Sequence, residues 1–161
     1  MSKNLILKGS EATDLILATY WRKIMVERKW YWIDANGEVL GRLSTVAVGI
    51  LQGKTKPEYS PNSDIGDFVL VTNAAKVKMT GNKLEQKLDY RHSGYPGGDK
   101  YILYKDLMLT DPEKIIKLSI SGMLPKNRLR TKRLRRLKIY KNDAKQLEAK
   151  CQKIQVNSSR Q

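Results

Sequence analysis

The chain has 161 residues, of which 40% are hydrophobic, so it is long and apolar enough for one domain with its own core. Its 31 Lys and Arg against 16 Asp and Glu give a formal net charge of +15, which indicates a polyanionic partner. The longest apolar runs are far shorter than the roughly eighteen residues of a transmembrane helix, and a single cysteine excludes an internal disulfide and favours a reducing compartment.

Residues 1–28 have the pattern of an amphipathic helical arm, with apolar residues recurring at intervals of three and four. The segment lacks the long apolar core and the cleavage site of a secretory signal, and its acids are unusual in an organelle transit peptide. We expect this arm to pack on another surface. Whether a leader was removed stays open. The apolar positions are Leu15, Ala18, Trp21 and Met25, and the acids are Glu11 and Asp14.

The next elements alternate between strand and helix. Trp30–Ile33 is aromatic and β-branched and is followed by a turn at residues 34–37, which predicts a strand. A helix should follow and end at Gly53, which suits a left-handed C-cap. Asp67–Asn73 is dense enough in apolar residues to be a strand that is covered on both faces. The apolar face of the helix is Leu40, Leu43, Ala47, Ile50 and Leu51.

The middle of the chain reads as a hairpin followed by a loop. Lys76–Met79 alternates as a strand does, and the turn at residues 80–83 should lead it to a second segment at residues 84–90. Residues 90–101 then form a Gly-rich loop. Glycines allow a close approach to another surface, and the Arg, His and Tyr side chains of this loop offer planar groups to phosphates, sugars and bases.

The last predicted elements are two helices and a strand. Asp111 as cap, Pro112 at the first position and Glu113 in the first turn begin a helix that should end at Gly122. A short helix over residues 127–137 and a strand over residues 138–140 follow. This order predicts a single three-layer α/β/α domain with a mainly parallel central sheet. It would occupy residues 29–141, between the arm at 1–28 and a basic C-terminal extension at 142–161.

Three small motifs suggest other chemistry only weakly. Gly53-Lys54-Thr55 resembles the end of a phosphate-binding loop, but the earlier glycine is Val48 and the order of helix and strand is reversed. His92 is the only histidine, and we predict a hydrogen-bonding or stacking role for it rather than catalysis. Asp64 and Asp67 are explained better by a turn before a strand than by acid–base work or a metal.

The segment from residue 114 to residue 142 contains eleven basic residues and no acid. Like charges this close repel one another, and no salt bridge within the segment can offset the repulsion. Phosphates of a nucleic acid would offset it, with a steep salt dependence of binding. The alternative of an amphipathic helix on an acidic membrane leaves too few apolar positions, and no DNA-binding motif is visible, so RNA is favoured.

Four ordered blocks of the chain resemble the universal large-subunit ribosomal protein thirteen family, in its bacterial and organellar branch. They are WYWIDANGEVLGRLSTVAVGILQGKTKPEYSP, DIGDFVLVTNAAKVKMTGNKLEQK, YRHSGYPGG and GMLPKNRLRTKRLRRLKIY. The resemblance implies a noncatalytic structural constituent of the large ribosomal subunit that binds large-subunit ribosomal RNA, supports subunit assembly and translation, and contacts neighbouring ribosomal proteins. It implies no cofactor, no metal, no membrane span and no small-molecule substrate.

The resemblance and the basic segment together give a set of residues expected to bind RNA. They are Arg42, Lys54, Lys56, Lys83, Arg91, His92, Tyr95, Lys100, Lys126, Arg128, Arg130, Lys132, Arg133, Arg135, Arg136 and Lys138. Asn127-Arg128-Leu129-Arg130 departs from many bacterial members and is closer to mitochondrial ones. A mitochondrial matrix is therefore favoured, with a bacterial cytoplasm or a plastid as alternatives.

Two other functions stay open at this point. The same charges permit a free regulatory RNA-binding protein outside the ribosome, and the alternation of strands and helices permits a nucleotide-handling α/β enzyme.

Overall fold

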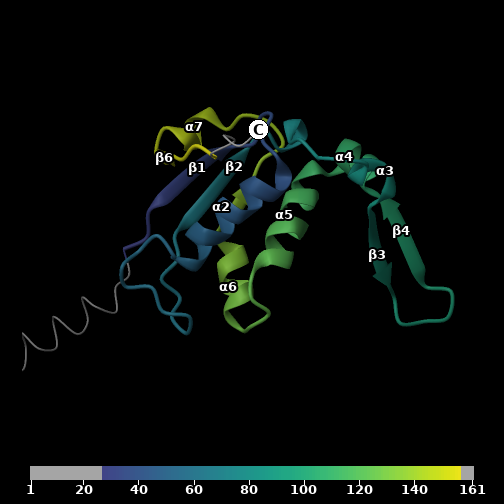
Figure 1. Ribbon diagram of the computed structural model, residues 1–161, viewed down its shortest axis with the longest axis horizontal. Coiled ribbons are helices and arrows are strands. Elements are labelled where there is room, and N and C mark those ends of the chain that lie inside the picture. Colours follow the sequence, from purple (N-terminus) through teal and green to yellow (C-terminus); the bar gives the residue numbers. More distant parts are fainter. Residues whose placement is uncertain (1–26, 157–161) are drawn as a thin grey trace, which may run out of the picture.

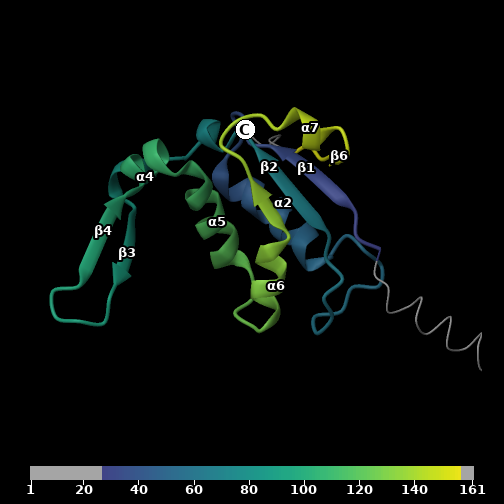
Figure 2. The same ribbon diagram turned by 180° about the vertical axis from the view of Figure 1, so that it is seen from behind.

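A parallel sheet forms the centre of the computed structural model, which describes residues 27–156 (Figures 1 and 2). Its strands lie in the order β5-β2-β1-β6, and each pairing is parallel. The elements in chain order are β1 (Trp30–Asp34), α2 (Leu40–Gln52), β2 (Phe68–Thr72), a short 3-10 helix (Ala74–Lys76), α3 (Lys83–Gln86), β3 (Leu88–His92), β4 (Asp99–Leu103), α4 (Tyr104–Thr110), α5 (Pro112–Met123), α6 (Leu129–Arg135), β5 (Leu137–Ile139), α7 (Lys145–Glu148) and β6 (Gln152–Lys153).

Helices lie on both sides of this sheet, which confirms the predicted α/β class with a mainly parallel sheet. Parallel neighbours need crossover connections, and the first of these is α2, which joins β1 to β2. The strands of this pair are in register from Trp30 opposite Phe68 to Asp34 opposite Thr72. The Trp30 and Phe68 rings stack with their centroids 4.5 Å apart, so the first pair of the register also packs through its side chains.

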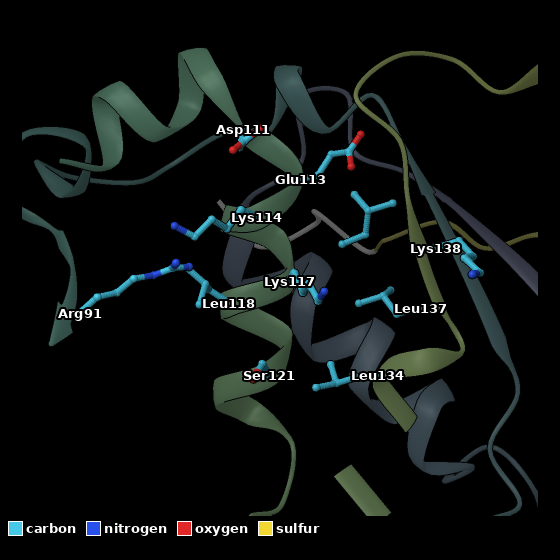
Figure 3. Close-up of a pocket in the computed structure, with 11 residues that line it drawn as sticks. Arg91, Asp111, Glu113, Lys114, Lys117, Leu118, Ser121, Leu134, Leu137 and Lys138 are labelled. Carbon is cyan, nitrogen blue, oxygen red and sulfur yellow. The ribbon is translucent and has the colours of Figure 1, made fainter. Parts of the chain in front are cut away.

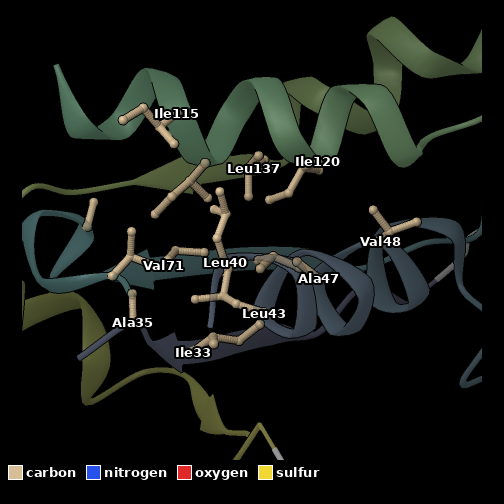
Figure 4. Close-up of a cluster of buried hydrophobic side chains, with 14 of the residues drawn as sticks. Ile33, Ala35, Leu40, Leu43, Ala47, Val48, Val71, Ile115, Ile120 and Leu137 are labelled. Atoms are coloured by element: carbon tan, nitrogen blue, oxygen red, sulfur yellow. The ribbon is translucent and has the colours of Figure 1, made fainter. Parts of the chain in front are cut away.

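The core lies between the sheet and the helices α2 and α5 (Figure 4). In Figure 4, Leu43 of α2 lies beside Ile33 of β1, and Ile115 and Ile120 point toward the core from α5; all four are fully buried. The helical spacing predicted this apolar face of α2 correctly. Gly53 ends α2 with φ +81°, the left-handed conformation expected of a C-terminal glycine, and its N–H donates to carbonyls of the last turn.

The start of α5 agrees with the prediction in part. Pro112 occupies the first turn and Glu113 follows it, but the Asp111 side chain makes no capping hydrogen bond. Instead the backbone N–H of Lys114 donates to the backbone carbonyl of Asp111 at 3.1 Å. The helix ends at Met123, one residue beyond the predicted end.

The predicted hairpin of residues 76–79 with residues 84–90 is wrong. A 3-10 helix occupies residues 74–76, and Lys78 contributes only an isolated parallel bridge to Val39. The hairpin of this region is formed by β3 and β4, which pair antiparallel from Leu88 opposite Leu103 to His92 opposite Asp99. The two ends of the expected Gly-rich loop therefore belong to strands, residues 90–92 to β3 and residues 99–101 to β4, and its glycines form the hairpin tip, which stands away from the rest of the molecule (Figure 1).

The segment after residue 141 adds to the central sheet. β6 pairs in parallel with β1, Tyr31 opposite Gln152 and Trp32 opposite Lys153. Val156 is buried and belongs to the core. The folded unit therefore continues to the last described residues, beyond the boundary expected at 141. The expected arm lies outside the described residues, apart from residues 27 and 28.

Candidate nucleic-acid interface

The basic segment divides into an inward and an outward face at α6. Arg133 and Arg136 lie three residues apart on one side of the chain, and they are only 2% and 5% exposed. Lys132 and Arg135 are exposed on the other side. Residues three apart share a face in helical backbone, so the spacing of these four residues produces the division. The apolar residue Leu134 packs against the core and fixes the orientation of α6.

The inward arginines surround one carboxylate, Asp64, in the connection between α2 and β2. Arg136 donates from Nη1 to Asp64 Oδ2 at 2.6 Å and from Nη2 to Oδ1 at 2.5 Å, a bidentate pair. Arg133 Nε lies 4.0 Å from Asp64 Oδ1. The hydrogen bonds from Arg136 hold the pKa of the Asp64 carboxyl below its ordinary value of 3.8, and the charges of Arg136, Arg28 and Arg133 act in the same direction against partial burial.

A close approach of two backbone segments brings Asp64 to this position. A Cβ at Gly66 would lie 1.9 Å from the carbonyl oxygen of Leu51, so only glycine allows the connection to lie against the end of α2. The same carbonyl of Leu51 accepts from Arg136 Nη2 at 3.4 Å. The basic segment is acid-free in sequence, but part of its charge is balanced within the protein, which corrects the expectation that phosphate alone would balance it.

The two lysines after α2 also differ. Lys54 is exposed. Lys56 donates from Nζ to Asp67 Oδ1 at 2.7 Å, and also to the backbone carbonyls of Glu27 and Ile65. Asp67 is fully buried and accepts a second hydrogen bond from the backbone N–H of Lys29. Asp64 and Asp67 are thus partners of cations, and their arrangement is unlike the turn in which each would accept from its own neighbouring backbone.

The hairpin of β3 and β4 exposes the predicted residues Arg91, His92, Tyr95 and Lys100. Tyr95 at the tip is 75% exposed. His92 Nδ1 accepts from the backbone N–H of Gly94 at 2.9 Å, and this hydrogen bond holds the imidazole within the turn. Arg91 Nε lies 3.5 Å from Asp89 Oδ2 in the same strand, so the charge of this guanidinium is partly neutralised within the hairpin.

The exposed predicted residues gather mainly at one end of the molecule. The connection after α2, the α5–α6 connection and the hairpin tip all reach toward the lower side in Figure 1, and Figure 2 agrees. Lys54, Lys126, Arg128 and the hairpin tip belong to this end. Arg42 lies near the opposite end of α2, about 18 Å away by the helical rise. Exposed Lys83 and Lys138 stand on α3 and β5, so the structure does not gather all of the predicted residues.

The alternative sites find no support in the described residues. Gly53 is the C-cap of a helix, so Gly53-Lys54-Thr55 does not precede one as a phosphate-binding loop must. No cluster of three His, Cys, Asp or Glu side chains that could hold a metal occurs within residues 27–156. Across the same residues, no helix is long and apolar enough to cross a membrane.

The sequence reasoning left out the aromatic pair of the hairpin. Tyr90 and Tyr101 stand opposite each other in the β3–β4 register, with ring centroids 5.1 Å apart, and both are more than half exposed. Tyr90 Oη also donates to Asp99 at 2.7 Å, which raises the pKa of this phenol. Recognising residues 90–101 as two paired strands would have placed these rings side by side.

A family described as Ribosomal protein L13 matches residues 28–146. The large ribosomal subunit protein uL13 of Natranaerobius thermophilus is 56% identical over 118 residues, which cover 73% of this chain and 82% of the relative. The protein of the same name from Salinispora arenicola is 52% identical over 115 residues, covering 71% and 78%. That from Thermotoga maritima is 55% identical over 115 residues, covering 71% and 77%. These relatives are bacterial and do not support the mitochondrial preference.

Proposed function

Because the chain belongs to the ribosomal protein L13 family, we propose that it is a structural constituent of the large ribosomal subunit. It binds large-subunit ribosomal RNA there, contacts neighbouring ribosomal proteins, and supports subunit assembly and translation. Proteins of this family are structural components, and the chain is not an enzyme. The nucleotide-handling enzyme is thereby set aside.

The observation that carries the proposal is the set of outward cations at the basic end. Lys126, Arg128, Lys132 and Arg135 are exposed, and none of them has an ion pair to a described residue. Four uncompensated cations within ten residues repel one another in the free protein. A phosphate backbone removes this repulsion and releases counterions, so the same residues supply the binding free energy.

The hairpin supports the proposal through its exposed aromatic rings as well as through charge. Its two strands are exposed on both faces, including Tyr90, Tyr101 and the tip residue Tyr95. A two-stranded ribbon without a covering layer is only marginally stable alone, so a partner is expected to stabilise it. Exposed tyrosines beside Lys100 can stack on unpaired bases while the cation binds phosphate, and this combination is typical of contacts with folded RNA.

The cations that pair with Asp64 and Asp67 have a different role in this proposal. Arg133, Arg136 and Lys56 are held by Asp64 and Asp67 and orient the surface that bears the RNA contacts. Arg130 donates to Ser121 Oγ at 2.6 Å and lies at the border between the two groups. Lys54 and the exposed cations around α6 form the main RNA contact, and the hairpin forms a second one.

Sedimentation of cell extracts tests the proposal. We expect the chain to co-migrate with large subunits at low salt and to leave them only as the salt concentration rises. A chain that sediments free of large subunits at low salt contradicts the proposal and favours the free regulatory RNA-binding protein. The relatives are bacterial, so we expect the chain in a bacterial cytoplasm. Fractionating organelles in the same experiment tests this compartment. Recovery of the chain in mitochondria or plastids would contradict the assignment.

A further inference from the structure

A groove lies between α5 and β5, and of the proposed RNA-contact regions only the hairpin contributes to its lining, through Arg91 (Figure 3). It has a volume of about 660 Å³. Leu118 of α5 lies on one side, and Leu134 and Leu137 lie on the other. Ile139 also lines the groove and is only partly buried. These four aliphatic residues form an apolar strip within a groove whose other lining residues are charged or polar.

The groove also exposes the open edge of the central sheet. β5 is the last strand in the order β5-β2-β1-β6, so only β2 pairs with it among the described strands. Backbone groups of Arg136 and Tyr140 bond to β2, through Val69 N–H and Val71 carbonyl. Adjacent residues of a strand direct their backbone groups to opposite sides, so those of Leu137 and Ile139 are directed to the open edge. Such an edge is a template for another strand.

The charges beside the groove favour carboxylates. Lys117 and Lys138 are exposed and have no hydrogen bond or ion pair to a described residue. Lys114 and Arg91 share one carboxylate, that of Asp89, at 2.6 Å and 3.5 Å. Of the two acids at the start of α5, Glu113 already accepts from the backbone N–H of Lys141 at 3.0 Å. The cations beside the groove therefore exceed the acids available to them.

We propose that this groove binds an extended segment of another protein, which adds to β5 as a fifth strand. Side chains of an added strand alternate between two faces. Those toward α5 are aliphatic, because they meet Leu118 and Leu137, and some of those on the other face are Asp or Glu, because they meet Lys138. RNA is the competing occupant, but none of the described residues that line the groove is aromatic and able to stack on a base, and an open strand edge offers RNA nothing specific.

Site-directed cross-linking of the full chain in its native complex tests the proposal. Leu118 is replaced with p-benzoylphenylalanine, and Leu109, which is 73% exposed on α4 outside the groove, receives the same group as a matched control. We expect position 118 to cross-link a protein segment with alternating aliphatic and acidic residues, identified by mass spectrometry. The substitution Lys117→Glu should lower the yield about fivefold at position 118 and leave it unchanged at position 109.

Hydrogen exchange of the unmodified chain provides a second measurement. The backbone amides of Leu137 and Ile139 should exchange quickly in the isolated chain and slowly in the native complex. They should also slow when a synthetic peptide of the cross-linked segment is added to the isolated chain. A cross-link to RNA, no cross-link above the control, or peptide binding without protection of these two amides would overturn the proposal. None of these outcomes bears on whether the chain sediments with large subunits, so that experiment tests the proposed function independently of the groove.

Discussion

The two faces of α6 carry the same residue type in opposite roles. Arg136 is buried and held by Asp64, whereas Arg135, its neighbour in sequence, is exposed and has no ion pair to a described residue. The first orients the helix on the domain, and the second is available to a phosphate. A count of positive charges along the segment cannot separate these roles, since the separation depends on a carboxylate from a distant part of the chain.

The largest effect should come from removing an inward arginine. Arg136→Ala leaves Asp64 with only the longer ion pairs to Arg28 at 3.8 Å and to Arg133 at 4.0 Å, so we expect the free energy of unfolding of the full chain to fall by about 3 kcal/mol. Arg135→Ala is the matched control and should change it by less than about 0.5 kcal/mol. Urea unfolding followed by circular dichroism measures both. If both variants lost the same free energy of unfolding, the inward and outward arginines would not differ in their contribution to stability.

Removing outward cations should weaken RNA binding with little effect on folding. For the triple variant Arg128→Ala, Lys132→Ala and Arg135→Ala, we expect the plot of log K against log salt to become shallower by about 2, since up to three phosphate contacts are lost. Filter binding to large-subunit ribosomal RNA at several salt concentrations gives the slope. An unchanged slope, with the unfolding free energy also unchanged, would remove this face from the interface.

At the tip of the hairpin, stacking of an aromatic ring on a base should contribute to RNA binding, whereas the outward face of α6 contributes through charge. Tyr95→Ala removes a ring that is 75% exposed, so stability should change little, but the loss of stacking on a base should cost about 1 kcal/mol of binding. The variant Tyr95→Phe keeps the ring and should bind nearly as the wild type does. Binding that falls equally in both variants would indicate a role for the hydroxyl instead.

Acidic pH should weaken the contact between Asp64 and the buried arginines, and it should leave the outward cations unaffected. This is the smallest of the four expected effects. The pKa of Asp64 is lower in the folded protein than its ordinary value of 3.8. Its stabilising contribution is therefore complete above about pH 4 and is lost as the pH falls through the lower, folded-state pKa. Asp64→Asn should reduce the pH dependence of the unfolding free energy below pH 4. If the unfolding free energy of the variant depended on pH as that of the wild type does, carboxylates other than Asp64 would be responsible for the acid sensitivity.

Much of the fold could be predicted from the sequence because its core elements carry strong periodicities. The apolar spacing of α2, the dense apolar run of β2, and Pro112 at the start of α5 located these elements closely. The short helix and strand of the basic segment were also predicted. Each of these signals lies within the element that it predicts, so the element can be recognised without knowledge of the tertiary contacts.

The failures occur where the deciding contact is distant in sequence or external. β3 and β4 are exposed on both faces, so they lack the alternation of a half-buried strand, and Gly94 and Gly97 suggested a loop. Burial of Arg133 depends on Asp64 and on the close approach at Gly66, neither of which is visible from the charge run itself. β6 is too short to leave a pattern.

The pairing of β6 with β1 has a consequence for synthesis of the chain. β1, the first of the described strands, acquires this neighbour only after nearly the whole described chain has been translated. Contacts between such distant residues require the ordering of a long intervening segment and slow the final folding step. A nascent chain paused before Gln152 would thus expose one side of β1 during elongation, at the stage when chaperones or RNA could still act on it.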